Sequence, residues 1–160
     1  MQIEIFTTGG TIDKVYFDAK SQFEVGEPQV RELLREANLC LDIGVTPLMR
    51  KDSLEMTEAD REQIRAAVAA SAARRIVVTH GTDTMTVTAR ALAGLPDKTI
   101  VLTGAMQPAR FRATDALYNL ASALTAVQLL PAGAWIVMNG RIFDPARTRK
   151  NVALNRFEEE

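Results

Sequence analysis

The sequence predicts an α/β fold of the Rossmann-like or flavodoxin-like kind: a layered, mostly parallel sheet with helices on both faces. Short β-branched runs alternate along the chain with segments of helical periodicity, which is typical of parallel βαβ units. Glycines or hydroxyl-bearing residues follow most of these runs directly, as expected for turns at the carboxyl ends of parallel strands. The 160 residues fit one domain, and no internal repeat or shift in composition indicates a second.

The first quarter of the chain predicts strand, loop, helix and strand in that order. Residues 2–7 alternate and are rich in β-branched residues, so we expect a buried strand that ends at the turn Gly9-Gly10. Residues 13–27 have no helical period and are long for a connection, which favours a functional, lid-like loop. Residues 28–37 have a proline at the first position and an apolar stripe, so we expect a helix, and residues 39–48 then read as a strand.

The middle of the chain carries the clearest helix, at residues 57–73. A threonine opens it, and an aspartate three residues on completes a capping-box pattern. Residues 76–79 are a short β-branched run typical of a buried parallel strand. A helix is expected at residues 84–93, before a glycine and a proline, and another buried strand at residues 99–103.

The last third predicts a long alanine-rich helix at residues 114–129, which a proline ends, and a strand at residues 135–138. The more polar tail, residues 139–160, is compatible with strand, loop or a frayed end. Since ligands of such folds bind at the carboxyl ends of the strands, we expect the functional site at that edge of the sheet.

Composition excludes several classes of function. The net charge of −1 lacks the basic excess of a nucleic-acid binder. Cys40 is the only cysteine and His80 the only histidine, which excludes an intramolecular disulfide, a cysteine zinc cage and a His-based zinc site. We therefore predict neither a metal nor an organic cofactor. The sequence shows no signal-peptide pattern and no apolar run of membrane-spanning length, so we expect a cytoplasmic protein with no membrane partner.

Two hydroxyls sit in glycine turns at predicted strand ends: Thr11 after Gly9-Gly10, and Thr82 in the segment after residues 76–79. Glycine lets the backbone approach a ligand closely, and exposed N–H groups in such turns stabilise an oxyanion. A hydroxyl needs a neighbouring base or charge to act as a nucleophile, and Asp83 adjoins Thr82.

Each feature also has a plain structural interpretation. The glycine pair is compatible with a tight turn alone, and it lacks the lysine of a phosphate-binding loop. Thr82 or Thr84 is compatible with a helix N-cap, and a lone His80 is more typical of a structural imidazole.

Taken together, the motifs resemble those of the bacterial L-asparaginase family. The resemblance spans almost the whole chain and has two signatures, Thr7-Thr8-Gly9-Gly10-Thr11-Ile12 and His80-Gly81-Thr82-Asp83-Thr84-Met85. Three further stretches agree: Asp52-Ser53-Leu54-Glu55-Met56, Leu102-Thr103-Gly104-Ala105-Met106-Gln107-Pro108 with Asp115 and Asn119 beyond it, and Val137-Met138-Asn139 leading to Lys150.

The resemblance implies a role for each matching position. Thr11 is then the nucleophile, and Lys150 with Asp83 polarises Thr82 or a water for proton transfer. Ser53 holds the substrate α-carboxylate and Asp83 its α-ammonium group. Backbone N–H groups near Gly10 and Thr82 form the oxyanion hole, and the implied substrate-binding set also includes Gly81 and Ala105.

Two positions depart from the family pattern. Phe23 stands where the family has a loop tyrosine that assists the nucleophile, so we expect Tyr16 of the same loop to supply the hydroxyl. Gln107 replaces the usual arginine, for which we expect a lost structural ion pair and no loss of chemistry.

The resemblance therefore implies one asparaginase N-terminal-type catalytic domain over residues 1–160, without the family's C-terminal domain, in a homo-oligomer, a dimer or a tetramer. The implied activity is that of an L-asparaginase (EC 3.5.1.1), which converts L-asparagine to L-aspartate and ammonia through a threonine acyl-enzyme. Three alternatives stay open: a glutaminase-asparaginase that also accepts L-glutamine, a non-catalytic amino-acid-binding relative, and a fragment of a longer enzyme.

Overall fold

The centre of the molecule is a six-stranded sheet, which a computed structural model of all residues 1–160 describes in the order β4-β1-β5-β6-β7-β8. The strands are β1 (Gln2–Gly9), β4 (Asp42–Lys51), β5 (Arg75–Thr79), β6 (Thr99–Thr103), β7 (Gly133–Met138) and β8 (Arg141–Phe143). The first five strands in this order pair in parallel, and β8 pairs antiparallel with β7. This is the flavodoxin-like arrangement, so the predicted fold class is confirmed.

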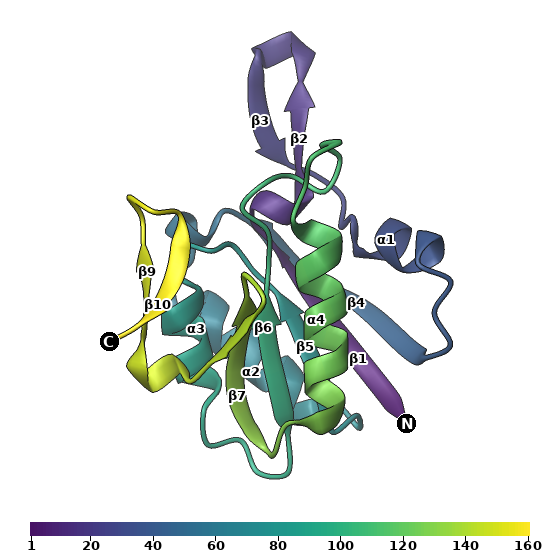
Figure 1. The fold of residues 1–160 in the computed structure, drawn as a ribbon, viewed down its shortest axis with the longest axis vertical. Coiled ribbons are helices and arrows are strands. Elements are labelled where there is room, and N and C mark those ends of the chain that lie inside the picture. The colour runs from purple at the N-terminus through teal and green to yellow at the C-terminus, as the bar shows by residue number, and fades with distance from the viewer.

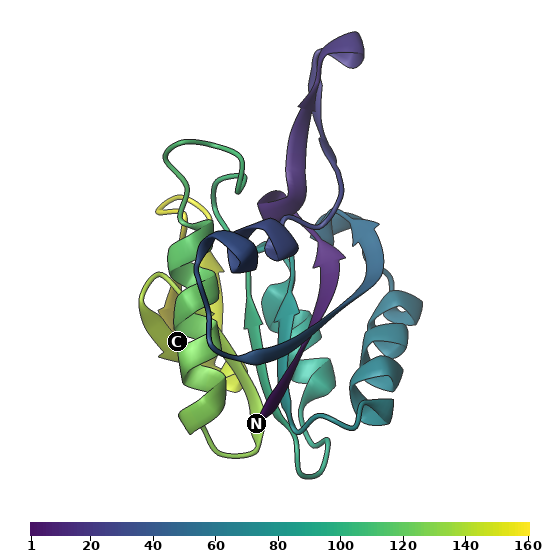
Figure 2. The same cartoon turned by 90° about the vertical axis from the view of Figure 1, so that its right-hand side faces the viewer.

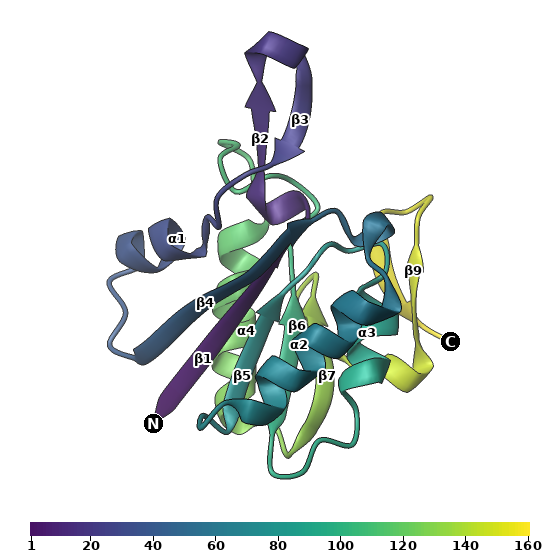
Figure 3. The same ribbon diagram turned by 180° about the vertical axis from the view of Figure 1, so that it is seen from behind.

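Helices cover both faces of the sheet (Figures 1 and 3). The helices α1 (Val30–Glu36) and α4 (Ala116–Leu129) lie on the face nearer the viewer in Figure 1. The helices α2 (Glu58–Ala70) and α3 (Met85–Leu92) lie on the opposite face, which Figure 3 shows from behind. The three layers divide the apolar core into two clusters, one on each side of the sheet.

Strand β5 shows how the sequence specifies a buried central strand. Ile76 and Val78 belong to the cluster under α2 and α3, whereas Val77 belongs to the cluster under α1 and α4. Side chains alternate between the faces of a strand, so a strand covered on both faces requires an unbroken apolar run.

The helix α2 begins with the capping box that the sequence predicts. Thr57 Oγ1 accepts a hydrogen bond from the N–H of Asp60, and the Asp60 carboxylate accepts one from the N–H of Thr57. The helix α1 differs from the expectation, because it begins at Val30 and not at Pro28. Gln29 is its N-cap residue, so the proline precedes the helix.

Residues 13–27 form regular structure, against the expectation of a loop. They contain an antiparallel hairpin of β2 (Lys14–Phe17) and β3 (Gln22–Val25), which projects from the body of the molecule (Figures 1 and 2). Its turn contains no glycine, and Ser21 adopts the left-handed conformation there with φ 51°. The hairpin stands above the edge of the sheet at which the parallel strands end.

The polar tail is ordered as two further strands, β9 (Thr148–Asn151) and β10 (Arg156–Glu159), which pair antiparallel. Phe157 of β10 is 2% exposed and packs against Phe143, with 6.2 Å between the ring centroids. This apolar contact fixes the tail against the body, which is why the residues do not fray. None of the helices has the length and hydropathy needed to cross a membrane.

Candidate active site

The first glycine turn lies at the carboxyl end of β1. The strand continues through Gly9, and Gly10 then turns the chain with φ +87°, a conformation that side chains rarely adopt. The N–H of Gly10 donates to the carbonyl oxygen of Lys51, 2.9 Å away, which ties the turn to the end of β4. Thr11 is the first residue of the 3₁₀ turn Thr11–Asp13, so the predicted nucleophile follows Gly10 directly in the chain.

The second glycine turn connects β5 with α3, and the side chain of His80 holds it through two hydrogen bonds. Its imidazole is fully buried, with Nδ1 2.7 Å from the Gly81 carbonyl oxygen and Nε2 2.8 Å from Thr88 Oγ1. A carbonyl oxygen only accepts, so Nδ1 carries the proton and Nε2 accepts from the threonine. Burial lowers the pKa of His80 to about 4, so the ring stays neutral. These contacts agree with a structural histidine.

The two glycine turns touch each other and the segment that carries Ser53. A Cβ atom on Gly10 would lie 2.4 Å from Cα of Gly81, and one on Gly81 would lie 2.7 Å from Oγ of Ser53. Both distances are shorter than carbon and oxygen atoms tolerate, so only glycine permits this approach. Ser53 is 1% exposed, and its carbonyl oxygen accepts from Thr84 Oγ1 at 2.8 Å. The fold thus gathers both motifs and the serine at one place.

Lys150, which lies in β9 of the tail, contacts the second glycine turn. Its Nζ donates to Thr82 Oγ1 at 2.7 Å and to Asp83 Oδ1 at 2.6 Å, and its side chain is 11% exposed. Arg90 of α3 donates to the carbonyl oxygens of Pro145 and Thr148, which holds the tail that bears Lys150. The predicted triad of hydroxyl, ammonium and carboxylate is therefore assembled in the structure.

Tyr16 lies apart from this cluster. It is 53% exposed on the hairpin, its ring packs on Phe23 with 5.4 Å between centroids, and its hydroxyl has no hydrogen-bond partner. Phe23 packs in turn on Phe111, at 5.7 Å, in the segment between β6 and α4. The structure therefore gives Phe23 a packing role and does not bring Tyr16 to Thr11.

The segment after β6 has its own polar support. The N–H groups of Met106 and Gln107 and the Asn119 side chain all donate to the Asp115 carboxylate. Gln107 uses its backbone for this bond, so the segment is held without the arginine. Ala105, a predicted substrate-binding residue, is 1% exposed and belongs to the core under α4.

Sequence reasoning missed the ion pair between Lys14 and Asp52, whose Nζ and Oδ2 atoms are 2.8 Å apart. Asp52 precedes Ser53, and Lys14 follows the turn of Thr11, so proximity to the motifs was the available signal. The two residues lie far apart in the sequence and share no pattern of their own, which is why the pair was not found.

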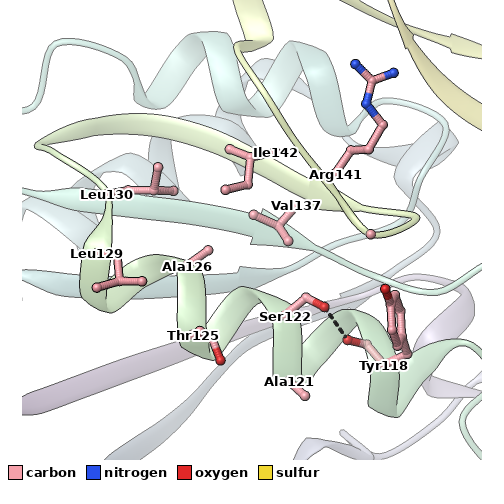
Figure 4. A pocket seen from close by; sticks show the side chains of 11 residues that line it. Tyr118, Ala121, Ser122, Thr125, Ala126, Leu129, Leu130, Val137, Arg141 and Ile142 are labelled. Atoms are coloured by element: carbon pink, nitrogen blue, oxygen red, sulfur yellow. Dashed lines mark hydrogen bonds between the residues drawn. The ribbon is translucent and has the colours of Figure 1, made fainter.

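An apolar cavity lies elsewhere and shares no residue with the cluster. It has a volume of about 520 Å³ and lies between α4 and the β7–β8 pair (Figure 4). Aliphatic side chains such as Leu129 and Ile142 line it, with Arg141 at one side. No group of three histidine, cysteine, aspartate or glutamate side chains has the geometry of a metal site.

Known proteins resemble this chain over nearly its whole length. The family model described as "Asparaginase, N-terminal" matches residues 2–158. The thermostable L-asparaginase of Thermococcus kodakarensis superposes with a TM-score of 0.86 and 28% identity, covering 99% of this chain and 51% of that one.

Two curated relatives carry other names. One is a subunit of the glutamyl-tRNA(Gln) amidotransferase of Methanococcus vannielii, which is 31% identical over 89% of this chain and 35% of its own length. The other is a glutaminase-asparaginase of Acinetobacter glutaminasificans, which is 29% identical over 96% of this chain and 50% of its own length. The chain thus spans about half or less of the proteins that it matches.

Proposed function

The chain belongs to the asparaginase family, as a match to its N-terminal domain, and from this premise we propose that it is an amidohydrolase that converts L-asparagine to L-aspartate and ammonia. The contact of Lys150 Nζ with Thr82 Oγ1 and Asp83 Oδ1 carries the proposal. A lysine that is nearly buried between a hydroxyl and a carboxylate is suited to moving a proton.

Thr11 is the proposed nucleophile. Its Oγ1 forms a bond to the carbon of the side-chain amide, the C–N bond breaks, and the threonine proton leaves on the nitrogen as part of ammonia. Backbone N–H groups near Gly10 and Thr82 would stabilise the oxyanion that develops. The contact between Gly10 and Gly81 supports this geometry, since it brings the two turns together.

Water completes the proposed cycle. Its oxygen forms a bond to the acyl carbon, the bond to Thr11 breaks, and its proton returns to the threonine oxygen. Lys150, held by Asp83, would polarise Thr82 or this water during the step. The short distances within this cluster support such a relay.

Substrate recognition is proposed to rest on two charged ends. Ser53 would bind the α-carboxylate, and Asp83 the α-ammonium group. Asp83 supports this role because its side chain is 37% exposed, so one face is open to a ligand while the other contacts Lys150.

The oligomeric state is a separate prediction: we expect this chain to form a homo-oligomer, a dimer or a tetramer.

L-Glutamine is the second candidate substrate, because a glutaminase-asparaginase is among the relatives. Glutamine is longer by one methylene, and such a difference is worth about 1–3 kcal/mol, or about 10–200-fold in kcat/KM. The proposal therefore commits to asparagine as the preferred amide and treats glutamine as a slower one.

The test measures ammonia release from L-asparagine and L-glutamine by the purified protein and by Lys150→Met. We expect faster release from asparagine and a loss of about 10²–10⁴ in kcat for Lys150→Met, the contribution typical of general acid–base catalysis. Lys98→Met is the matched control, since Lys98 binds the carbonyl oxygens of Ser71 and Ala73 and precedes β6, at the opposite edge of the sheet. A folded wild type that binds amino acids but releases no ammonia would indicate a binding protein.

A further inference from the structure

Two short 3₁₀ turns carry the groups on which the proposed function rests. Thr11 lies in the turn Thr11–Asp13, and Ser53 in the turn Ser53–Glu55. A nucleophile and a carboxylate-binding group must hold a fixed separation, because near-attack geometry allows errors of no more than about 1 Å. The elements that connect the two turns are therefore expected to influence the reaction.

Lys14 and Asp52 are the residues that cap these two turns. The N–H of Lys14 donates to the carbonyl oxygen of Thr11 and so closes the first turn. The Asp52 carboxylate accepts from the N–H of Leu54, at 3.1 Å, and so opens the second. The ion pair between Lys14 Nζ and Asp52 Oδ2, at 2.8 Å, joins one cap directly to the other.

The surroundings of the Lys14–Asp52 ion pair favour its formation. Each side chain is 28% exposed, so the pair is partly shielded from water. Burial opposes ionisation of Asp52, yet the hydrogen bonds from Lys14 and Leu54 outweigh it and hold the pKa of the carboxyl below its usual range. The charge of Lys150 acts in the same direction, so Asp52 lies within electrostatic reach of the proposed proton relay.

A backbone contact links the same two segments. The N–H of Gly10 donates to the carbonyl oxygen of Lys51, the residue before Asp52. This bond fixes the strand ends, and the ion pair adds a side-chain contact beyond them, between the residues that cap the two turns. The ion pair is the one salt bridge that connects the two turns.

We propose that Lys14 and Asp52 are positioning residues for the active site, whose ion pair sets the placement of Ser53 relative to Thr11. The inference rests on the proposed function. Neither residue forms or breaks a bond with the substrate. Loss of the pair is expected to impair the binding of the α-carboxylate more than the chemical steps at Thr11.

The experiment measures kcat and KM for L-asparagine in Lys14→Met, Asp52→Asn, the double variant and Lys14→Arg. We expect each single variant to raise KM about threefold to fivefold with kcat within about twofold, a size typical of a partly exposed ion pair. The double variant should be no worse than either single variant, because the second substitution removes a contact that is already lost. Lys14→Arg should restore a KM close to that of the wild type.

Lys20→Met is the matched control. Lys20 pairs with Glu24 at 2.7 Å within the same hairpin, but this pair does not reach the Ser53 turn. An unchanged KM in Lys14→Met, additive effects in the double variant, or an equal effect of Lys20→Met would overturn the positioning role and leave the proposed function intact. A folded wild type without amidohydrolase activity would overturn both.

Discussion

Asp13 and His80 are buried ionisable side chains at the two glycine turns, and burial shifts their pKa values in opposite directions. Burial raises the pKa of Asp13 to about 7, although the N–H of Gln29 and the charge of Arg50 lower it. Burial lowers the pKa of His80 to about 4. Asp13 is thus mainly neutral below about pH 7 and His80 above about pH 4, so both side chains are mainly neutral between these values.

The two shifts have opposite effects on stability. The folded pKa of Asp13 lies above its ordinary value of 3.8, so its contribution to stability is greatest below about pH 4 and is lost as the pH rises towards 7. The folded pKa of His80 lies below its ordinary value of 6.5, so its contribution is greatest above pH 6.5 and is lost as the pH falls towards 4. Between these limits the contributions oppose each other.

The variant Asp13→Asn should separate the two contributions. The amide oxygen can still accept from the N–H of Gln29, but the buried group no longer ionises. We expect the free energy of unfolding to rise by about 1–3 kcal/mol at about pH 8 and to change little at about pH 4. Urea denaturation at both pH values measures it, with the exposed Asp97→Asn as the control. Identical pH profiles for wild type and Asp13→Asn would contradict the assignment.

At the scale of elements, the hairpin β2–β3 follows the turn of Thr11 and carries the exposed Tyr16. The aromatic series of Tyr16, Phe23 and Phe111 fixes the hairpin to the segment before α4. From the sequence, we expect the Tyr16 hydroxyl to assist the nucleophile. Because Tyr16 is exposed in this arrangement, that role requires the hairpin to bring it towards Thr11 when substrate binds.

The variant Tyr16→Phe tests this role without altering the packing. The ring that contacts Phe23 is retained and only the hydroxyl is lost. If the hydroxyl transfers a proton, kcat should fall by about 10²–10⁴. Steady-state kinetics measures the change, with Phe17→Leu in the neighbouring position as the control. An unchanged kcat would remove Tyr16 from the mechanism.

Among the strands, those that are buried on both faces are the ones whose bounds the sequence predicts best. The strand β6 has the predicted bounds, since an apolar run between polar turns leaves little freedom of interpretation. The hairpin was missed because its strands are short and partly exposed, and its turn lacks the glycine that marks most hairpins.

Local sequence likewise predicts some residues of the candidate site and not others. The positions of Thr11 and Thr82 in glycine turns follow from local sequence, because the turns end predicted strands. Lys150 approaches Thr82 across 68 residues, and only the family resemblance pointed to it. The pairing of Lys14 with Asp52 depends on how the hairpin leaves the sheet, which no local pattern encodes.

At the scale of the whole molecule, one α/β domain brings both signature motifs to a single edge of its sheet. The turns after β1 and β5 touch through Gly10 and Gly81, and the tail adds Lys150. The relatives are about twice as long or longer, so the proposal requires that the groups for acyl transfer lie within the part that this chain represents.

Ammonia release from L-asparagine by Thr11→Ala, beside wild type and Thr11→Ser, tests this requirement most directly. We expect Thr11→Ala to fold normally, since the backbone N–H of Lys14 closes the turn by donating to the carbonyl oxygen of Thr11, and to lose about a thousandfold or more in kcat. Thr11→Ser, which keeps a hydroxyl, should retain part of the activity. A folded Thr11→Ala that releases ammonia at the wild-type rate would contradict the acyl-enzyme at Thr11.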